Sequence, residues 1–383
     1  MNSNPTMMPM GLAEIEQAVH GRLVAAEGIA SNGAMATSAC SDSRQVREGS
    51  VFVAIAGERV DGHDFVSKVG AQGAVAALVD HEVADAGVPQ IVVDDTVRAL
   101  GELAKRNLER RRAIGSPFTV IGITGSVGKT TTKDLMASLL SAMGETVAPV
   151  GSFNNEIGLP LTALKVNAGT RFLVAEMGAN HVGEIANLTS LVPPDIAVVL
   201  KVGVAHLGEF GSAERIAQAK SEIVKGLVPG GVTVLNANDE HVAAMSGIAP
   251  GEVLWFGLPQ RRTPDRMVAA ENVRCDELDH PSFELRDAEG ECAKGYFMRP
   301  TIFDNCTPDM TIVREEIFGP VVTIQTFQTE EEAIALANDT IYGLAGGVFT
   351  HQLERALRVV KEVRAGITWV NAFNPTYNEA PWG

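Results

Sequence analysis

The stretch "GITGSVGKTTTKD", residues 122–134, decides how the sequence around it folds. It follows the apolar run "FTVI" (118–121) and leads into residues 129–144, whose apolar positions have helical spacing. A glycine-rich turn between a strand and a helix leaves backbone N–H groups without partners. It directs them, together with the helix dipole, toward an anion. The sequence therefore predicts a phosphate-binding turn at the carboxyl end of a buried strand.

The residues of this turn favour a nucleotide phosphate. Lys129 follows Gly128 and precedes Thr130, so an ammonium group can reach the terminal phosphates while a hydroxyl group binds Mg²⁺. The strict GxxxxGK[ST] spacing is not met, because its first glycine would fall at Ile123. The alternative is a glycine turn with an incidental lysine, which the preceding strand and the following helix make less attractive. The predicted nucleotide-binding residues are Gly125, Ser126, Val127, Gly128, Lys129, Thr130 and Thr131.

The turn begins a regular alternation of apolar strands and helical patterns. The strand candidates are residues 118–124, 145–150, 172–178, 196–203, 231–238 and 252–257. Near-continuous apolar strands that alternate with helices indicate an α/β fold whose parallel sheet is covered on both faces. Ligands of such sheets lie beyond the carboxyl ends of the strands. The turn, "EMGANH" (176–181) and "VGVAHLGEFGS" (202–212) all fall there.

The flanking sequence predicts further domains. Residues 1–113 read as a small α/β domain with short strands at 50–57 and 89–95 and a helix over 96–113. "IGSP" (114–117) has the composition of a linker. Residues 267–293 alternate polar and apolar positions in the manner of a hairpin. We therefore predict domains at 1–113, 114–293 and 294–383, the central one a mostly parallel sheet of the P-loop type.

The bulk composition excludes several classes of protein. The 383 residues are 45% hydrophobic and 20% charged, as in a globular protein of two or three domains. A net charge of −16 argues against binding to nucleic acid. The apolar runs are shorter than the roughly 18–20 residues that span a bilayer, and the N-terminus does not resemble a signal peptide. We expect a cytoplasmic protein without membrane insertion, whose four widely spaced cysteines are reduced.

Three residues beyond the turn are candidates for metal or phosphate chemistry. Glu176 lies just past the apolar strand "FLVA", so its carboxylate should emerge at the ligand-binding edge as a hard oxygen ligand for Mg²⁺. A solvated loop glutamate is the alternative. His206 ends the next strand and is either a ligand or a structural histidine. Lys220 lies in a helical pattern, where spacing alone favours a solvated lysine.

Three asparagines are candidates for substrate or nucleotide contacts. Asn154 and Asn155, in "GSFNNEIGLP", either present amides to a substrate or cap the following helix. Asn236, with Asp239, ends a strand where a base or ribose could be held, although an ordinary turn is equally compatible.

Taken in order, several motifs resemble those of the Mur ligase family. They are "GITGSVGKTTTKD", "GSFNNEIGLPLT", "EMGANHVGEIA", "VGVAHLGEFGS", "AQAKSEI" and "LNAND", preceded by "SDSRQVREGSVFVAIAGERVDGHDFV", which is similar to the UDP-binding domain of the family. The resemblance covers about residues 10–293. It implies an ATP-dependent amide ligase of peptidoglycan synthesis. The family member that it most resembles joins D-alanyl-D-alanine to UDP-N-acetylmuramoyl tripeptide through an acyl phosphate.

The resemblance also implies roles for individual residues. Lys129 and Thr130 would bind phosphates and Mg²⁺, Glu176 would hold Mg²⁺, and His206 would help to hold a second ion. Lys220 matches a lysine that these ligases carry as a carbamate. The positions expected near the UDP-sugar are Ser43, Arg44, Asp61, Gly62 and His63. Two positions depart from the family pattern, because Lys201 and Asn238 stand where asparagine and aspartate are usual.

The last ninety residues resemble a different family. "REEIFGPV" (314–321) and its surroundings, over about 294–383, are similar to aldehyde dehydrogenases of the betaine type. That resemblance implies a nicotinamide-ribose contact for Glu316 and a ring contact for Phe318. The upstream dinucleotide-binding half is replaced by ligase-like sequence, and Cys306 matches a non-catalytic position.

We therefore interpret the chain as a chimera joined near Ala293, in which an aldehyde dehydrogenase-like fragment replaces the ligase domain that brings in the amine. This predicts impaired ligation. It also predicts a monomer whose tail exposes apolar surface and could aggregate. Two alternatives remain: a nucleotide-binding protein without catalysis, and an NAD-dependent aldehyde dehydrogenase.

Overall fold

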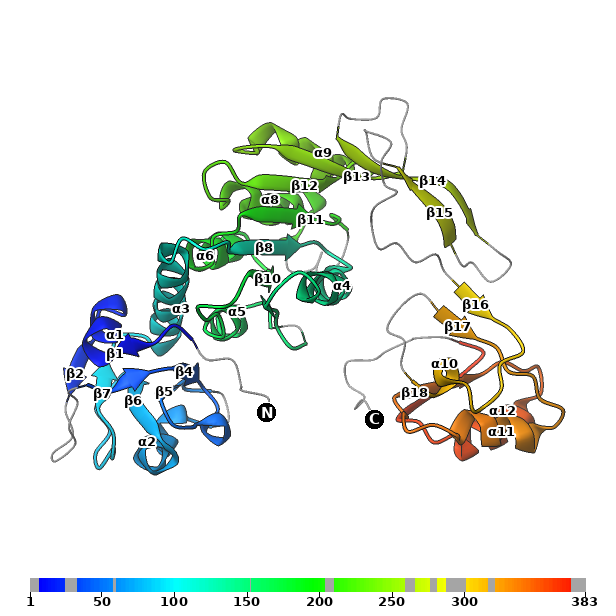
Figure 1. Ribbon diagram of the computed structural model, residues 1–383, viewed down its shortest axis with the longest axis horizontal. Coiled ribbons are helices and arrows are strands. Elements are labelled where there is room, and N and C mark those ends of the chain that lie inside the picture. The colour runs from blue at the N-terminus through cyan, green and yellow to red at the C-terminus, as the bar shows by residue number, and fades with distance from the viewer. Residues whose placement is uncertain are drawn as a thin grey trace. The chain divides into compact units, whose positions relative to one another are not determined.

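The computed structural model describes residues 7–24, 33–57, 60–151, 153–203, 210–258, 266–275, 281–286, 301–315 and 321–372. The chain divides into two compact units, one formed by residues 1–270 with 286–290 and the other by residues 271–285 with 291–383. Figure 1 shows the first unit in blue to green and most of the second in yellow to red.

The N-terminal part of the first unit is a five-stranded sheet with the order β2-β7-β6-β5-β4. Its strands are β2 (Arg22–Val24), β4 (Ser38–Cys40), β5 (Ser50–Val53), β6 (Ala74–Val79) and β7 (Gln90–Val92). Only β2 runs antiparallel to its neighbour. A short pair, β1 (Met10–Gly11) and β3 (Met35–Ala36), lies beside it, with helices α1 (Leu12–Ala18) and α2 (Val66–Val69). The α/β elements predicted for residues 1–113 are therefore present, in a sheet of their own.

Helix α3 (Thr96–Ala113) has the bounds that the sequence predicts. Asp95 caps it, because its side chain accepts hydrogen bonds from the N–H groups of Val97 and Arg98. The helix packs against α5 (Gly158–Ala163) and α6 (Glu184–Leu191) of the central part. The buried Asn107 side chain donates to the carbonyl oxygens of Ala163 and Val166, at 3.0 and 2.9 Å. Residues 114–117, predicted as a linker, are thus a short turn after a helix that is bonded to both parts, and the boundary at residue 113 stays a prediction.

The central sheet has eight strands in the order β15-β14-β13-β12-β11-β8-β10-β9. Its strands are β8 (Thr119–Thr124), β9 (Thr146–Val147), β10 (Phe172–Glu176), β11 (Ile196–Val199), β12 (Val232–Asn236), β13 (Val253–Gly257), β14 (Met267–Cys275) and β15 (Pro281–Arg286). Neighbours from β9 to β14 are parallel. The predicted mostly parallel α/β sheet is confirmed.

Helices cover this sheet and place its loops. The faces carry α4 (Lys129–Ser141), α5, α6, α8 (Ala213–Lys225) and α9 (Glu240–Ala244), as Figure 1 shows. Every residue of β10 is buried, as expected of a strand that is covered on both sides. Because β8, β10, β11 and β12 are parallel, their carboxyl ends meet at one edge. That edge carries the glycine turn and the residues that directly follow β10 and β11.

Besides most of β14 and β15, the second unit contains two separate parallel strand pairs. Strand β16 (Thr301–Phe303) pairs with β17 (Val321–Thr323), and β18 (Ala345–Val348) pairs with β19 (Ile367–Val370). The helices are α10 (Thr311–Arg314), α11 (Glu330–Asn338) and α12 (Leu353–Glu362). Among residues 303–315 and 322–372, Cys306 and Ala356 are the only hydrophobic residues that are buried, whereas Ile341 is 90% exposed. The expected exposure of apolar surface is present in this unit.

Among the helices that the structure describes, none is both long enough and apolar enough to cross a bilayer.

Candidate functional site

The glycine turn has the backbone geometry that its sequence requires. Gly128, at φ +83°, stands in the left-handed region immediately before α4, a conformation that a side chain would strain. Lys129 begins the helix, and its Nζ donates to the carbonyl oxygen of Gly125 at 2.9 Å, so the lysine folds back across the turn. The neighbouring Ser126 N–H donates to the carbonyl oxygen of Lys201 at 2.8 Å, which fixes the turn to the end of β11. Lysine, helix N-terminus and turn thus form a single cationic edge.

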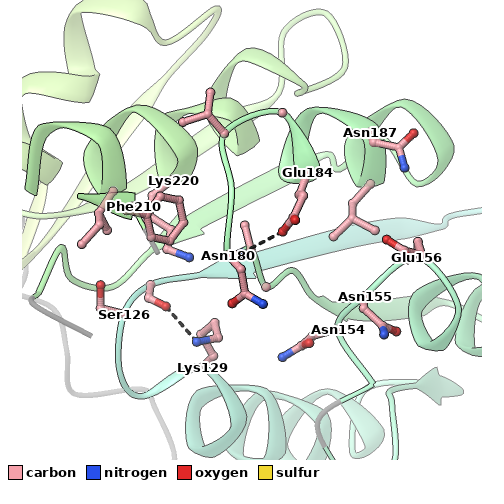
Figure 2. A pocket seen from close by; sticks show the side chains of 17 residues that line it. Ser126, Lys129, Asn154, Asn155, Glu156, Asn180, Glu184, Asn187, Phe210 and Lys220 are labelled. Atoms are coloured by element: carbon pink, nitrogen blue, oxygen red, sulfur yellow. Dashed lines mark hydrogen bonds between the residues drawn. The ribbon is translucent and has the colours of Figure 1, made fainter. Parts of the chain in front are cut away.

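This edge opens into a cavity of about 390 Å³. Figure 2 shows Lys129 and Lys220 pointing into it from α4 and α8, with Asn154 and Asn155 on the loop before α5. Six residues predicted from the sequence line the cavity, namely Gly125, Ser126, Lys129, Asn154, Asn155 and Lys220. The structure therefore brings together side chains that lie far apart along the chain.

Glu176 ends β10 and is almost completely buried, with 1% of its surface exposed. Its Oε1 accepts a hydrogen bond from Asn154 Nδ2 at 2.8 Å, whereas its Oε2 is buried without a hydrogen-bond partner. A buried carboxylate oxygen without a partner is costly unless a cation satisfies it. The solvated-loop alternative is therefore wrong, and the donor chemistry fits Mg²⁺. Metal binding by Glu176 and by Thr130, in the first turn of α4, stays a prediction.

Lys220 is not the solvated lysine that its spacing favours. Only 3% of it is exposed, and its Nζ lies 6.0 Å from the centroid of the Phe210 ring. Burial, and secondarily the positive charge of Lys129, lower the pKa of Lys220 from 10.5 to about 8. Glu184 and Glu222 act in the opposite direction. A larger share of the amine is therefore neutral near pH 7 than in an exposed lysine, and a neutral amine is what carbamate formation requires.

Replacing Lys220 with methionine should raise stability at neutral pH. The folded protein disfavours the charged amine, so below pH 8 the full penalty applies. Between pH 8 and 10.5 the folded state releases its proton before the unfolded state does, and the penalty disappears. The shift corresponds to about 3 kcal/mol. We expect Lys220→Met to raise the free energy of unfolding by about 2–3 kcal/mol at pH 7. The gain should fall through this range and approach zero only above about pH 10.5.

Urea unfolding at several pH values measures this difference. The matched control is Lys225→Met, which removes an exposed lysine from the last turn of the same helix. The control should show no pH-dependent gain across this range. If the free energy of unfolding of the two variants depended on pH in the same way, the pKa of Lys220 would not be lowered in the folded protein.

The asparagines make hydrogen bonds within the protein, and their substrate contacts stay predictions. Asn155 Oδ1 accepts from the Gly158 N–H at 2.9 Å, so it satisfies the first N–H group of α5 while lining the cavity. Asn154 is bonded to Glu176, so it links the loop to the carboxylate. Asn236 Nδ2 donates to the Leu200 carbonyl oxygen at 2.9 Å. The hydrogen bond of Asn236 is therefore the kind that an ordinary turn makes, and its contact with a nucleotide stays a prediction.

The positions assigned to the UDP-sugar lie in two turns that follow strands of the N-terminal sheet. Ser43 and Arg44 form a single turn after β4, and Arg44 pairs with Asp42 at 2.7 Å. Gly62 and His63 are buried. A Cβ at Gly62 would lie 2.6 Å from the Ile55 nitrogen, so only glycine fits. These contacts do not test whether the residues bind the UDP-sugar, so that role stays a prediction. His206 (within 204–209) and Glu316 with Phe318 (within 316–320) lie outside the described residues.

Some residues of this region escape sequence reasoning. Lys133 is fully buried, and its Nζ donates to the Pro149 and Gly151 carbonyl oxygens at 2.9 and 3.1 Å. It thereby positions the loop that carries Asn154. The cavity also includes Asn180 and Glu184 from "EMGANHVGEIA". Their polarity at the carboxyl end of a strand is the signal that could have identified them.

The comparisons with known families divide the chain in the same way as the motifs. The model of the Mur ligase family, catalytic domain, matches residues 38–108, and that of the Mur ligase middle domain matches residues 123–292. The model of the aldehyde dehydrogenase family matches residues 283–383. Both predicted resemblances are confirmed.

Curated relatives cover the ligase-like part. UDP-N-acetylmuramoyl-tripeptide–D-alanyl-D-alanine ligase of Mycobacterium tuberculosis H37Rv is 42% identical over 275 residues, 66% of this chain and 52% of the relative. The Escherichia coli K12 protein of that name is 38% identical over 225 residues, 59% of this chain and 48% of the relative. The chain thus spans about half the length of the curated relatives it matches.

Solved structures confirm the fold. MurF from Acinetobacter baumannii matches with a TM-score of 0.64 and 34% identity, covering 74% of this chain and 60% of that one. MurF ligase from Thermotoga maritima, in complex with ADP, matches with a TM-score of 0.57 and 25% identity, covering 88% and 84%.

Proposed function

We propose that this chain, which carries Mur ligase domains over residues 38–108 and 123–292, is an ATP-dependent carboxylate–amine ligase acting on UDP-N-acetylmuramoyl tripeptide. One observation carries the proposal. A cationic turn, a buried carboxylate with an unpartnered oxygen and a buried lysine meet at one edge of the parallel sheet. The names of the relatives and the ADP in the Thermotoga maritima complex support the same substrates.

The geometry suits the activation of a carboxylate by ATP. A carboxylate oxygen of the peptide attacks the γ-phosphorus and ADP leaves, which gives an acyl phosphate. The amine of D-alanyl-D-alanine then attacks the carbonyl carbon and loses a proton, and phosphate departs with the former carboxylate oxygen. Two anions must approach in line, and at an effective dielectric constant of about 20 unit charges 4 Å apart repel by about 4 kcal/mol. Lys129 offsets this repulsion at the terminal phosphate.

A Mg²⁺ ion would neutralise the phosphate charge that Lys129 does not. Glu176, with its free buried oxygen, and Thr130 would hold it, and when bound it neutralises phosphate charge. The buried Lys220 faces the same cavity as Lys129. As a carbamate it would carry a negative charge and serve as a further metal-facing carboxylate.

We further propose that ligation is impaired in this chain, which we interpret as a chimera joined near Ala293. The match to the middle domain ends at residue 292, and the following segment matches aldehyde dehydrogenases. We do not expect a segment of that origin to bind D-alanyl-D-alanine and hold it at the cavity. Nucleotide and UDP-peptide binding depend on the preceding residues and should persist.

Calorimetric titration and a phosphate-release assay test these proposals together. We expect heat of binding with Mg·ATP and with UDP-N-acetylmuramoyl tripeptide, and slow phosphate release that requires the peptide. Release that D-alanyl-D-alanine accelerates would exclude a purely binding protein. An absence of heat with both ligands would overturn the ligase proposal. Aldehyde-dependent NADH formation, measured in parallel, should be absent.

A further inference from the structure

Glu222 carries a buried carboxylate that the proposed chemistry does not use. It lies on α8, in the helical turn that carries Lys220, and 8% of it is exposed. Its Oε1 accepts a hydrogen bond from the Gly183 N–H at 2.7 Å, and its Oε2 accepts one from the Ala186 N–H at 2.9 Å. The backbone of a neighbouring helix, α6, therefore satisfies both oxygens.

These two N–H groups are the ones that a capping box satisfies. Gly183 is the N-cap of α6, and Ala186 is the third residue of that helix. In a capping box, the N-cap side chain accepts from the third N–H, and a glutamate at the third position accepts from the N-cap N–H. Glycine and alanine can supply neither acceptor, so Glu222 supplies both from α8. Gly183 also has φ +100°, a conformation that a side chain would strain.

The cap fixes one wall of the cavity. We call residues 178–184 the cavity wall, and its lining members are Gly178, Ala179, Asn180, Val182, Gly183 and Glu184. Glu184 begins α6, and its Oε2 accepts a hydrogen bond from the Asn180 N–H at 2.7 Å, which Figure 2 marks with a dashed line. Because Glu222 holds the first turn of α6, it also holds Asn180 through Glu184.

The cavity wall shares its cavity with the phosphate-binding turn. Ser126 and Lys129 of that turn line the same cavity, and Lys220 points into it from α8. Under the proposed function, the group that enters this space beside the terminal phosphate is the peptide carboxylate. A reaction between two bound groups requires both to be held in a defined geometry. The cavity wall is therefore suited to hold the peptide.

We propose that Glu222 is a positioning residue for the peptide substrate, because it caps α6 from α8 and thereby fixes the cavity wall. The inference rests on the proposed function and adds a residue that does not touch the substrate. Without the cap, the wall has to become ordered when the peptide binds, and this cost lowers the affinity. The phosphate-binding turn is fixed separately, by its bond to the end of β11, so nucleotide affinity should not depend on Glu222.

Calorimetric titration of Glu222→Gln with UDP-N-acetylmuramoyl tripeptide and with Mg·ATP tests the inference. Glutamine has the shape of glutamate but keeps one acceptor oxygen, and its amide group faces an N–H donor. We expect the peptide affinity to fall about tenfold and the Mg·ATP affinity to stay within about twofold. The matched control is Glu214→Gln in the first turn of α8, which removes an exposed charge and should leave both affinities unchanged.

Two further variants separate the cap from the charge of Glu222, which also attracts Lys220. Glu222→Gln should cause the same fold loss of peptide affinity in a Lys220→Met background. Ala186 is exposed, so a glutamate there has room to reach back to the Gly183 N–H. Adding Ala186→Glu to Glu222→Gln should regain about threefold in peptide affinity, because part of the cap is restored.

The outcomes distinguish this inference from the proposed function. If the wild type binds the peptide and Glu222→Gln binds it equally well, the inference is overturned and the ligase proposal stands. Equal losses of peptide and Mg·ATP affinity, or no recovery with Ala186→Glu, would also overturn it, because the effect would then not come from the capped wall. An absence of peptide binding in the wild type would contradict the proposed function, and the role of Glu222 with it.

Discussion

Replacing Lys129 with alanine should weaken Mg·ATP binding by about 10–150-fold, which corresponds to the loss of one hydrogen bond to a charged group, about 1.5–3 kcal/mol. The ammonium group now bonded to the Gly125 carbonyl oxygen is the cation available to the terminal phosphates. Burial lowers the pKa of Lys129, so removing its charge should not destabilise the protein. Calorimetric titration with Mg·ATP measures the change.

A comparison with Lys225→Ala separates the local effect from a general change of charge. Lys225 is exposed at the end of α8, and its removal should leave ATP affinity unchanged. UDP-peptide affinity should be retained in both variants, which shows that the proteins are folded. Equal ATP affinity in Lys129→Ala and wild type would mean that the turn does not hold a triphosphate.

Glu176→Gln should produce two effects of opposite sign. Glutamine retains an oxygen that can accept from Asn154 Nδ2, but it removes a buried charge whose Oε2 has no hydrogen-bond partner. Without Mg²⁺, we expect the free energy of unfolding to rise by at most about 1–2 kcal/mol, because Oε2 is buried without a hydrogen-bond partner. The loss of the attraction between Glu176 and Lys129 offsets part of this gain. Mg²⁺-dependent ATP affinity should fall at least tenfold, since a hard oxygen ligand is lost.

The control for this variant is Glu156→Gln. Glu156 lines the same cavity but is exposed, so the net charge changes equally without altering a buried group. We expect little change in stability or in Mg²⁺ dependence. If Glu176→Gln bound ATP with the Mg²⁺ dependence of the wild type, Glu176 would not be a metal ligand.

Periodicity suffices to predict much of the fold. The helix 96–113 is predicted with correct bounds because its apolar positions recur regularly, and in the structure Asp95 caps its first turn. The buried strands of the central sheet are apolar throughout, since both faces are covered, and this makes them recognisable. The order of the ligand loops follows from the parallel arrangement.

Strand ends and burial of polar groups depend on contacts that a linear pattern does not contain. Strand β11 ends at Val199, earlier than predicted, because the backbone of Leu200 and Lys201 turns to bond with Thr124 and Ser126. Strand β9 comprises only Thr146–Val147, and Pro149 cannot donate to a ladder beyond it. Lys220 reads as solvated, but three-dimensional packing buries it beside Phe210.

In the segment after residue 293, local sequence patterns do not predict which apolar side chains are buried. Its helices and strands form, yet Phe349 and Leu353 remain largely exposed within the unit. Amphipathic helices such as α12 are stabilised by burying one face, which requires a partner surface. Sequence patterns specify the faces of such elements but not whether the rest of the chain covers them.

The most direct measurement of carboxylate activation follows the fate of an oxygen atom. The peptide carboxylate is labelled with ¹⁸O, and hydroxylamine replaces D-alanyl-D-alanine, so the reaction does not need a domain that binds the dipeptide. If ATP phosphorylates the carboxylate, hydroxylamine releases a hydroxamate, and the phosphate carries one labelled oxygen. Unlabelled phosphate would mean that water, and not the peptide, attacks ATP, and it would contradict a ligase site at Lys129.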